Sequence, residues 1–342
     1  MIEARLFEKL TDQQVRCHVC AHHCLIRPGS RGVCQVRENR SGTLYSLVYG
    51  QVISAAVDPI EKKPLFHFKP GSKAYSVATV GCNLSCSFCQ NADISQAQRD
   101  RNSWGGYEMS PALIVRNALE QRCASIAYTY TEPTVFYEYA FDISTAARDG
   151  TIANVWVSNG YMSEQVLDSL VNPPDVNLID AANIDLKAFQ NSFYRTQCGA
   201  SLQPVLDNLI RLKKLGVWLE VTTLVIPGLN DSEEELRELA RFIKHDLGSE
   251  TPWHVSRFHP TYHLLDRERT PVETLHKAYD IGLAEGLDYV YVGNLPGDKG
   301  EHTICPGCKK IVVQRSGYTI RQYQIKNSKC AYCGREIAGV GL

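Results

Sequence analysis

The chain has 342 residues, enough for one large α/β-barrel domain with small additions or for two ordinary domains. It carries 36 Lys and Arg residues against 37 Asp and Glu, and this net charge of −1 gives no sign of binding to nucleic acid or to an anionic membrane. Met1 to Leu10 contains charges and does not resemble a signal peptide, and no apolar run approaches the length of a membrane span. We expect a cytoplasmic protein with small-molecule or protein partners, no nucleic acid and no membrane.

The cysteine content is high and odd, with thirteen cysteines in the chain. Eleven of them form three groups of four, three and four cysteines, and the spacings within each group are mostly short. No export signal precedes them. In a chain without such a signal, this pattern indicates metal binding in a reducing compartment and not disulfides. Cys123 and Cys198 lie outside the groups, and we expect both to be small buried side chains.

The first group follows the pattern C-x2-C-x3-C-x9-C within an amino-terminal segment that we place at residues 1–42. Its members are Cys17, Cys20, Cys24 and Cys34. Four thiolates suffice for a closed zinc site and also for an auxiliary iron–sulfur cluster, and both alternatives stay open. His18, His22 and His23 are alternative ligands, although we favour exposed histidines beside the cysteines. We expect a structural role, because the group is remote in sequence from the central motif.

A short lead-in connects this segment to the core. Residues from Thr43 to Val57 alternate and are rich in Val, Ile and Tyr, which predicts a hairpin with Gly50 at its turn. The stretch from Asp58 to Pro70 is either a loop near the central cysteines or a surface linker. Together these parts form a hairpin and lead-in over residues 43–73.

The central group is the stretch Gly81 to Gln90, which contains Cys82, Cys86 and Cys89 in the pattern C-x3-C-x2-C. Three thiolates can hold three irons of a [4Fe-4S] cluster and leave the fourth iron without a protein ligand. An open iron is a place for chemistry. The alternatives are a zinc knuckle or a set of buried thiols.

This spacing, with the aromatic Phe88 directly before the last cysteine, resembles the signature of radical S-adenosylmethionine (radical SAM) enzymes. The resemblance implies that the amino and carboxylate groups of S-adenosylmethionine chelate the open iron. It also implies that an electron from the cluster cleaves the sulfonium to give a 5′-deoxyadenosyl radical, which abstracts hydrogen.

After this motif, β-rich runs alternate with amphipathic helical runs about every 30 residues. The expected strands are Ala74–Val80, Ser125–Tyr130, Ala153–Ser158, Ala182–Leu186, Trp218–Val225, His254–Phe258 and Tyr289–Val292. The expected helices are Pro111–Gln121, Thr134–Asp149, Ser163–Val171, Leu202–Leu215, Ser232–Leu247 and Pro271–Glu285. Strand–helix–strand succession predicts a parallel sheet and therefore an α/β fold, with a full or partial (β/α) TIM-like barrel over residues 74–300. A doubly wound sheet is the competitor, and in both the site lies at the carboxyl ends of the strands.

Polar residues follow the second and third expected strands. Glu132, close after Tyr130, can accept hydrogen bonds from a ligand ammonium group such as that of S-adenosylmethionine. Its position matches the place where related enzymes carry a Gly-Gly-Glu type motif, but this sequence lacks the glycine pair. Capping of the helix that begins at Pro133 is the alternative. Ser158 and Asn159 can approach a ribose or adenine, and a simple turn is the alternative.

The fourth to sixth expected strands end in further candidates. Asp185 and Lys187 share one face and suit a zwitterionic ligand, with a structural ion pair as the alternative. Thr222 shares a face with Glu220, and Arg257 and His259 reach the expected barrel mouth, as does Ser256 in the other register. A metal set made of His254, His259 and His263 is disfavoured, because no carboxylate or thiol partner is placed with them.

The carboxyl-terminal segment, residues 301–342, carries the third cysteine group. Two C-x2-C pairs are separated by 21 residues of β-like sequence: Cys305 with Cys308, and Cys330 with Cys333. This spacing predicts a zinc ribbon, in which two turns offer paired thiolates to one ion. Metal binding supplies much of the folding free energy of so small a module, so a purely structural role suffices.

Taken together, the sequence is similar to pyruvate formate-lyase activating enzyme, and most closely resembles the radical SAM member of the AmmeMemoRadiSam system. The amino-terminal cysteines, the central motif, Tyr128 to Pro133 and Asp185-Leu186-Lys187 carry the resemblance. It implies a [4Fe-4S] cluster and S-adenosylmethionine as cofactors, a reductant such as ferredoxin or flavodoxin, and an association with Memo-like and AMMECR-like proteins. The expected contacts to S-adenosylmethionine are Asn83, Phe88, Gln90, Tyr130, Glu132, Ser158, Asn159, Asp185, Lys187, Thr222, Arg257 and His259.

The main hypothesis is a radical SAM enzyme whose cluster is held by the three central cysteines and whose substrate is a small molecule, peptide or protein. One alternative is an activase that generates a glycyl radical on a partner protein. An alternative of another class is a metal-stabilised scaffold that binds partner proteins without catalysis.

Overall fold

The computed structural model describes residues 1–172 and 176–342, and its contacts divide the chain into two interleaved units. Unit 1 comprises Met1–Asp58, Lys73–Ala181 and Cys198–Ala200. Unit 2 comprises Pro59–Ser72, Ala182–Gln197 and Ser201–Leu342. The segment boundaries predicted from the sequence stay predictions, since these units exchange segments along the chain.

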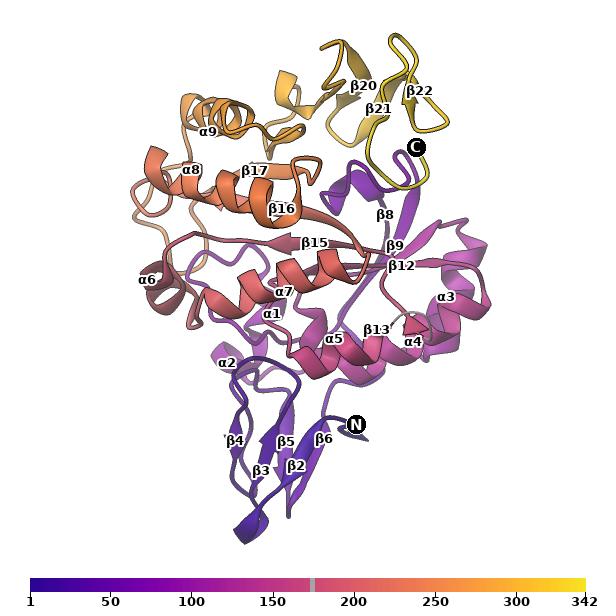
Figure 1. Cartoon of the computed structure of the whole chain (residues 1–342). Helices are drawn as coiled ribbons and strands as arrows, with labels where there is room; N and C mark the ends of the chain where they lie inside the picture. Colours follow the sequence, from indigo (N-terminus) through magenta and orange to yellow (C-terminus); the bar gives the residue numbers. More distant parts are fainter. Residues whose placement is uncertain (173–175) are drawn as a thin grey trace. The chain divides into compact units, whose positions relative to one another are not determined.

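Parallel strands form the centre of unit 1 (Figure 1). β11 (Ser125–Tyr128) lies between β9 (Lys73–Ala78) and β12 (Ala153–Ser158), with Ser125 opposite both Ala74 and Ala153, and β8 (Ser54–Pro59) follows β9 in the strand order. All four residues of β11 are buried, as expected for a strand covered on both faces. The strands alternate with α3 (Pro111–Glu120), α4 (Tyr137–Asp149) and α5 (Glu164–Leu170).

Local sequence explains where these helices begin. The Ser110 and Ser163 side chains accept hydrogen bonds from the backbone N–H groups of Leu113 and Val166, so both serines act as N-caps. Pro111 occupies the first turn of α3, where a missing N–H costs nothing. The helix expected from Thr134 begins as a 3-10 turn (Pro133–Phe136) that leads into α4.

Two small antiparallel sheets form the amino-terminal part of unit 1 and appear in indigo in Figure 1. The first has the order β1-β6-β5 and the second the order β2-β3-β4. Their strands are β1 (Ile2–Glu3), β2 (Phe7–Lys9), β3 (Val15–Cys17), β4 (Leu25–Ile26), β5 (Arg37–Arg40) and β6 (Thr43–Ser46). The remaining short elements of this unit are β7 (Gln51–Val52), α1 (Ala92–Ser95), α2 (Ala97–Arg101), β10 (Tyr107–Glu108), β13 (Val171–Asn172) and β14 (Val176–Asn177).

The predicted hairpin around Gly50 is wrong. β6 pairs with β1 and β5, whereas β7 pairs with β10, a strand that comes more than fifty residues later. Gly50 does adopt a left-handed backbone, with φ +73°, so the turn exists. The alternating residues on either side of that turn find partners elsewhere in the sequence, which local pattern alone does not reveal.

Unit 2 continues the alternation of parallel strands and helices. Its strand order is β18-β17-β16-β15, formed by β15 (Ala181–Asp185), β16 (Trp218–Val225), β17 (Trp253–Arg257) and β18 (Val290–Gly293). The helices are α6 (Asn191–Phe193), α7 (Gln203–Lys214), α8 (Glu233–Phe242) and α9 (Val272–Ala284). π-helical turns occupy Tyr194–Cys198 and Ile243–Leu247, so the helix expected over 232–247 changes its hydrogen-bond pattern after Phe242. The seven expected core strands all exist, which confirms the α/β class.

The carboxyl-terminal part of unit 2 consists of short antiparallel strands, drawn in yellow in Figure 1. They are β19 (Thr303–Ile304), β20 (Ile311–Ser316), β21 (Thr319–Tyr323), β22 (Ile325–Lys326) and β23 (Lys329–Cys330). Two of the cysteines belong to the apolar cluster beneath these strands, with Phe66, Tyr289 and Tyr291 among its other members. The hairpins therefore pack around two of their own cysteines, Cys305 and Cys330.

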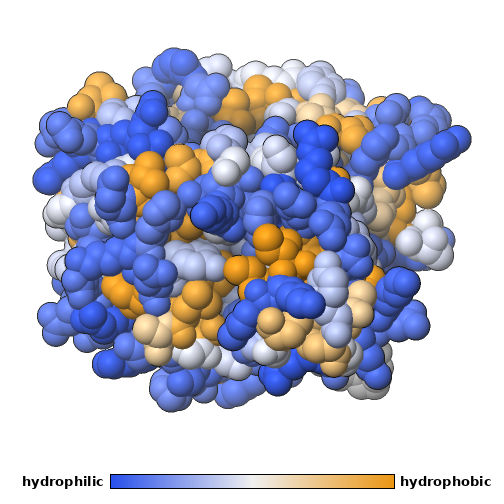
Figure 2. All heavy atoms as spheres, turned by 90° about the horizontal axis from the view of Figure 1, so that it is seen from above, coloured by the Kyte–Doolittle hydropathy of each residue, from blue (hydrophilic) through white to orange (hydrophobic). Residues whose placement is uncertain are grey.

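The face of the protein drawn in Figure 2 is mainly hydrophilic, with hydrophobic residues in separate patches. Among the described residues, no helix combines the length and the apolar character that a membrane crossing requires.

Candidate active site

The loop that follows β9 carries Cys82, Cys86 and Cys89. Gly81 begins it with φ +105°, and a Cβ at this position would stand 2.7 Å from Val36 Cγ1, so the tight entry to the loop requires glycine. The N–H of Cys89 donates to the carbonyl of Cys86 at 3.2 Å, and the N–H of Leu84 donates to Cys82 Sγ at 3.4 Å. The backbone thus turns around the cysteine side chains and offers one of them a donor.

Asn159, at the end of β12, connects two residues of this loop. Its side-chain Nδ2 donates to Asn83 Oδ1 at 2.8 Å and to Cys82 Sγ at 3.7 Å. Its Oδ1 accepts from the N–H of Tyr161 at 2.9 Å. Since Asn83 is fully buried, its amide serves to hold the loop against the end of β12. The predicted turn at Ser158-Asn159-Gly160 therefore carries a specific contact to Cys82, one of the predicted cluster ligands.

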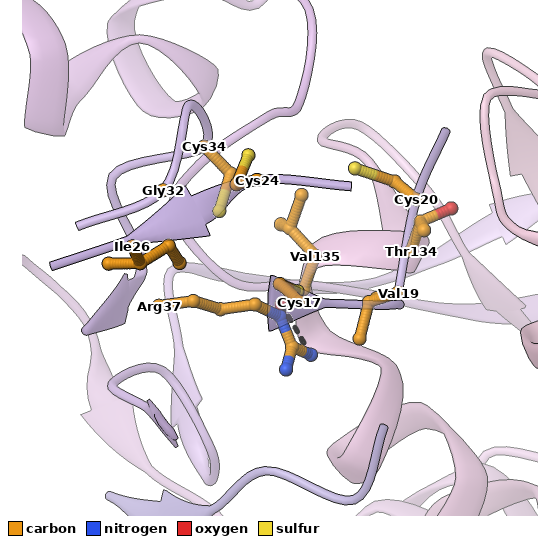
Figure 3. Close-up of a pocket in the computed structure, with 10 residues that line it drawn as sticks. All are labelled: Cys17, Val19, Cys20, Cys24, Ile26, Gly32, Cys34, Arg37, Thr134 and Val135. Atoms are coloured by element: carbon orange, nitrogen blue, oxygen red, sulfur yellow. Dashed lines mark hydrogen bonds between the residues drawn. The ribbon is translucent and has the colours of Figure 1, made fainter. Parts of the chain in front are cut away.

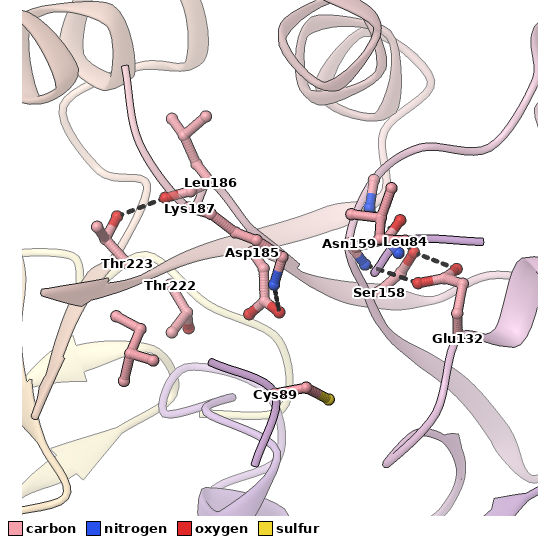
Figure 4. Close-up of polar contacts among 12 residues, drawn as sticks. Leu84, Cys89, Glu132, Ser158, Asn159, Asp185, Leu186, Lys187, Thr222 and Thr223 are labelled. Atoms are coloured by element: carbon pink, nitrogen blue, oxygen red, sulfur yellow. Dashed lines mark hydrogen bonds and ion pairs between the residues drawn. The ribbon is translucent and has the colours of Figure 1, made fainter. Parts of the chain in front are cut away.

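Glu132 accepts four hydrogen bonds, and Figure 4 draws those from Ser158 and Asn159. The donors are the backbone N–H and hydroxyl of Thr134, the hydroxyl of Ser158 at 2.8 Å and the N–H of Asn159 at 2.8 Å. The carboxylate caps the turn that begins at Pro133, as one sequence alternative proposed, and it also joins the ends of β11 and β12. Burial raises its pKa, and the hydrogen bonds from Thr134 and Asn159 oppose that rise.

Tyr130 occupies a left-handed backbone conformation, with φ +65°, that is uncommon for an aromatic residue. Its hydroxyl donates to the carboxylate of Asp58, and its carbonyl accepts from Asn91 Nδ2 at 3.0 Å. Phe88 is buried beside the loop, whereas Gln90 is exposed. Contacts of these residues with S-adenosylmethionine stay predictions.

The donor set around the three central cysteines fits an iron–sulfur cluster. Burial, and after it the carboxylate of Glu132, raises the pKa of Cys82 well above its usual range, so metal binding must displace a proton from this thiol. The N–H of Leu84 and the amide of Asn159 point at the same sulfur and would stabilise its thiolate. Such a cluster, when bound, supplies a one-electron reductant with an open iron.

In unit 2, the candidates of β15 and β16 lie close to one another, as Figure 4 shows. Lys187 Nζ is 2.8 Å from Asp185 Oδ2, and the side chain of Asp185 is 38% exposed, so the pair borders solvent. Thr222 Oγ1 donates to Asn183 Oδ1 at 2.9 Å on the neighbouring strand. The predicted Asp–Lys pairing exists, and both the ion-pair alternative and a zwitterionic ligand remain compatible with it.

Arg257 and His259 follow β17. Arg257 Nε donates to the carbonyl of Thr270 at 2.8 Å, which orients the guanidinium, and the side chain is half-buried. Partial burial and the nearby charges of Arg269 and Arg257 lower the pKa of His259, which favours its neutral imidazole.

A buried cluster in unit 2 went unrecognised in the sequence. His254 Nε2 lies 2.7 Å from Glu220 Oε2, although the sequence placed no carboxylate with the histidine. The same carboxylate accepts from the N–H groups of Phe66 and His67, and the His67 ring contacts the hydroxyl of Tyr291 at 2.5 Å. Glu220 lies near the amino end of β16, opposite the edge expected for catalysis, so this network supports the fold.

The amino-terminal cysteines line one cavity in unit 1, shown in Figure 3. Beside it, the buried Arg37 forms a two-point contact with Glu138, at 2.9 Å to Oε1 and 2.5 Å to Oε2. His22 Nε2 contacts the carbonyl of Asn83 at 2.8 Å, while His18 lies 3.7 Å from Glu8 and His23 is exposed. His22 and His18 therefore contact other groups of the protein, and His23 faces solvent.

The carboxyl-terminal cysteines are the most compact group. Ligand atoms of Cys305, Cys308, Cys330 and Cys333 all lie within 4.8 Å of one another, and two sulfur–sulfur distances are 3.6 and 3.7 Å. A tetrahedral zinc with Zn–S bonds of about 2.3 Å places its sulfurs about 3.8 Å apart. Against the effect of burial, the N–H groups of Tyr332 and Cys333 lower the pKa of Cys330 to about 7, which favours its thiolate. This geometry fits one tetrahedral ion.

Comparison with known proteins identifies the family of the chain. Residues 76–243 match the family model described as the radical SAM superfamily. An uncharacterized protein of Methanocaldococcus jannaschii is 45% identical over 98% of this chain and 99% of its own. Pyruvate formate-lyase-activating enzyme of Clostridium pasteurianum is 24% identical, over 48% of this chain and 66% of its own length.

Among solved structures, a radical SAM methyltransferase from Sphaerobacter thermophilus aligns with a TM-score of 0.51 and 18% identity, covering 68% of this chain and 71% of that one. Streptococcus suis SuiB bound to its precursor peptide aligns with a TM-score of 0.51 and 14% identity, covering 69% and 51%. These likenesses concern the fold. With the matched cysteine loop at its centre, the chain belongs to the radical SAM superfamily and is an enzyme related to pyruvate formate-lyase activating enzyme.

Proposed function

We propose that this enzyme reductively cleaves S-adenosylmethionine and uses the resulting 5′-deoxyadenosyl radical to abstract hydrogen from a small-molecule, peptide or protein substrate. The observation that carries the proposal is the loop after β9, which carries all three cysteines and in which Cys82 Sγ accepts hydrogen bonds from Leu84 and Asn159. Cys82, Cys86 and Cys89 would hold three irons of a [4Fe-4S] cluster and leave one for the cosubstrate.

The chain's own residues would then bind and orient the cosubstrate. Asp185 and Lys187 offer opposite charges at the carboxyl end of β15, which suits the zwitterionic methionine end of S-adenosylmethionine. Ser158 and Asn159 end β12 beside Cys82 and suit the adenosine part. The hydrogen bonds that Glu132 accepts fix the orientation of this strand end and thereby the donor to Cys82.

The test is anaerobic reconstitution with iron, sulfide and a low-potential reductant, followed by quantification of 5′-deoxyadenosine and methionine. Cys86→Ala should abolish 5′-deoxyadenosine formation. The matched control is Cys123→Ala, which removes a buried cysteine outside all three groups and should retain it. Normal product formation by Cys86→Ala would contradict the proposal, and zinc without iron or sulfide in the purified protein would favour the scaffold alternative.

A glycyl-radical activase is the second candidate, because two curated relatives are the pyruvate formate-lyase-activating enzyme and an isethionate sulfite-lyase activating enzyme of Oleidesulfovibrio alaskensis. In that case electron paramagnetic resonance should detect a stable radical on a partner polypeptide after turnover. No such signal is expected with a small-molecule substrate. We further propose ferredoxin or flavodoxin as the reductant and Memo-like and AMMECR-like proteins as candidate partners.

We also propose zinc as the metal of the carboxyl-terminal cysteines. The two sulfur–sulfur distances near those of a tetrahedral zinc site support this assignment.

A further inference from the structure

The three cysteine groups differ in how closely their sulfurs approach. In the part of the chain that the structure describes, the Cys305 group is the only set of three or more Cys, His, Asp or Glu side chains whose ligand atoms all lie within 4.8 Å. The central cysteines, which belong to a cluster by family, do not meet this spacing. Neither do Cys17, Cys20, Cys24 and Cys34, although all four line one cavity (Figure 3).

This difference in sulfur spacing distinguishes a zinc site from an iron–sulfur cluster. One zinc ion draws four sulfurs to about 3.8 Å from one another, as the Cys305 group approximates. In a [4Fe-4S] cluster each thiolate binds a different iron, so the sulfurs stand farther apart. The amino-terminal group resembles the central cysteines in this respect and not the carboxyl-terminal ones. We propose that Cys17, Cys20, Cys24 and Cys34 bind an iron–sulfur cluster, which passes electrons to the central site.

The surroundings of the cavity suit such a cluster. The N–H of Val33 donates to Cys24 Sγ at 3.5 Å. Arg37 lines the cavity with 2% of its surface exposed, and its Nε has no hydrogen-bond partner among the described residues. A buried donor beside four thiols is available to a cluster sulfide. The cavity measures about 20 Å³, room for about one water molecule, so the thiols must turn outward as the cluster binds. The wider sulfur spacing favours the cluster, because a single zinc ion would draw the four thiols to about 3.8 Å from one another.

Direct contacts join this module to the central cysteine loop within unit 1. His22 Nε2 lies 2.8 Å from the carbonyl oxygen of Asn83, the residue after Cys82. The His22 ring packs edge-on to Tyr161, with ring centroids 4.9 Å apart. Arg99 donates both to the carbonyl of Val33 at 3.0 Å and to that of Leu84 at 3.4 Å. The Arg99 side chain therefore bridges Val33, the residue before Cys34, and Leu84, two residues after Cys82.

These contacts give electrons a bonded route between the two sites. A low-potential one-electron donor, of the ferredoxin or flavodoxin class, would reduce the amino-terminal cluster by one electron. That electron would then pass through the loop of Cys20 to Cys24 and the His22–Asn83 contact to reduce the central cluster by one electron. No proton moves and no bond forms or breaks in this transfer. This electron relay from the amino-terminal to the central cluster rests on the proposed function. The assignment of an iron–sulfur cluster to the amino-terminal cysteines does not.

The metal bound by the amino-terminal cysteines is identified in a variant without the central cluster, Cys82→Ala/Cys86→Ala/Cys89→Ala. This variant is reconstituted anaerobically with iron, sulfide and zinc. We expect about four irons and about four sulfides per chain to remain, with a reduced-cluster signal in electron paramagnetic resonance. Unaltered protein should hold about eight irons, a measurement that does not depend on folding of a variant. About four irons per unaltered chain together with about two zinc ions would overturn the proposal. Either result leaves S-adenosylmethionine cleavage as a separate measurement.

The relay is tested with His22→Ala. Freeze-quench spectroscopy with a photoreduced donor should show severalfold slower reduction of the central cluster, identified by the change that S-adenosylmethionine causes in its signal. The midpoint potential and S-adenosylmethionine affinity should stay unchanged, whereas a merely structural role would alter them. The matched control is His276→Ala, which also removes a 2.8 Å histidine contact, to Asp298. Equal reduction rates in unaltered protein and His22→Ala would refute the relay.

Discussion

The side-chain amide of Asn159 donates a hydrogen bond to the sulfur of Cys82 at 3.7 Å. The same nitrogen donates to Asn83 Oδ1 at 2.8 Å, so one amide contacts both a proposed cluster ligand and the residue that follows it. Hydrogen bonds to cluster sulfurs stabilise the more negative, reduced state and thereby raise the reduction potential. Asn159 is thus placed to adjust the potential at which the central site accepts an electron.

Asn159→Ala should lower the reduction potential of the central cluster and slow 5′-deoxyadenosine formation. The missing N–H no longer stabilises charge on Cys82 Sγ, and Asn83 Oδ1 loses its donor at 2.8 Å. An anaerobic redox titration followed by electron paramagnetic resonance measures the potential. Asn172→Ala, which removes an exposed asparagine, serves as the control. An unchanged potential in Asn159→Ala would show that the 3.7 Å contact carries no charge stabilisation.

Glu132→Gln should destabilise the protein by about 1–3 kcal/mol, the usual cost of leaving buried hydrogen-bonding groups unsatisfied. The carboxylate accepts from Thr134, Ser158 and Asn159, and the amide NH2 of glutamine would face one of these donors. Denaturant unfolding under anaerobic conditions measures the free energy. Glu120→Gln alters an exposed glutamate of α3 and should change the free energy little. Equal stability of the two variants would contradict the capping role.

The sequence predicted the parallel core because its pattern is local. Runs such as Ala153–Ser158 are apolar and β-branched, and serine caps such as Ser163 begin the helices that follow. The hairpin at Gly50 failed because β7 finds its partner at Tyr107–Glu108, and strand pairing over such a separation leaves no mark in a local pattern.

The sequence could predict those parts of the candidate site that lie at the end of a single strand. Glu132 and Asn159 were found by their positions after β11 and β12, but the hydrogen bonds that link them depend on how neighbouring strands align. The Glu220–His254 pair was missed for the same reason. Thr222 lies opposite His254 in the register, and the contact becomes visible only when β16 and β17 are adjacent. The sequence signal that could have indicated this contact was the alternation of buried polar residues along both β16 and β17.

Removal of metal from the carboxyl-terminal cysteines should unfold that module. We expect about one zinc per chain at this site, and Cys308→Ser should lose it without altering the iron content. Cys305 and Cys330 belong to the apolar cluster around Phe66 and Tyr291, so metal loss also weakens packing within unit 2. Elemental analysis gives the zinc and iron contents, and limited proteolysis reports the loss of structure. Full zinc retention by Cys308→Ser would exclude the four-thiolate site.

The free energy of unfolding should fall as the pH is lowered from 6.5 towards 4. Burial lowers the pKa of His67 to about 4, against an ordinary value of 6.5, so the unfolded chain binds a proton in this range that the folded protein does not. The neutral ring is held between the carbonyl of Ala338, at 2.6 Å, and the hydroxyl of Tyr291, at 2.5 Å. At 1.36 kcal/mol per pKa unit, the loss across the window amounts to roughly 3 kcal/mol.

His67→Gln isolates this contribution, because glutamine can still donate and accept hydrogen bonds but does not titrate. Glu220, whose pKa is lowered chiefly by its hydrogen bond to His254 against the effect of burial, loses its stabilising charge only at still lower pH. Between pH 6.5 and 5, the free energy of unfolding of His67→Gln should therefore vary less with pH than that of the unaltered protein. Denaturant titrations at several pH values measure both slopes. Parallel slopes would mean that His67 takes up a proton in the folded protein as readily as in the unfolded chain.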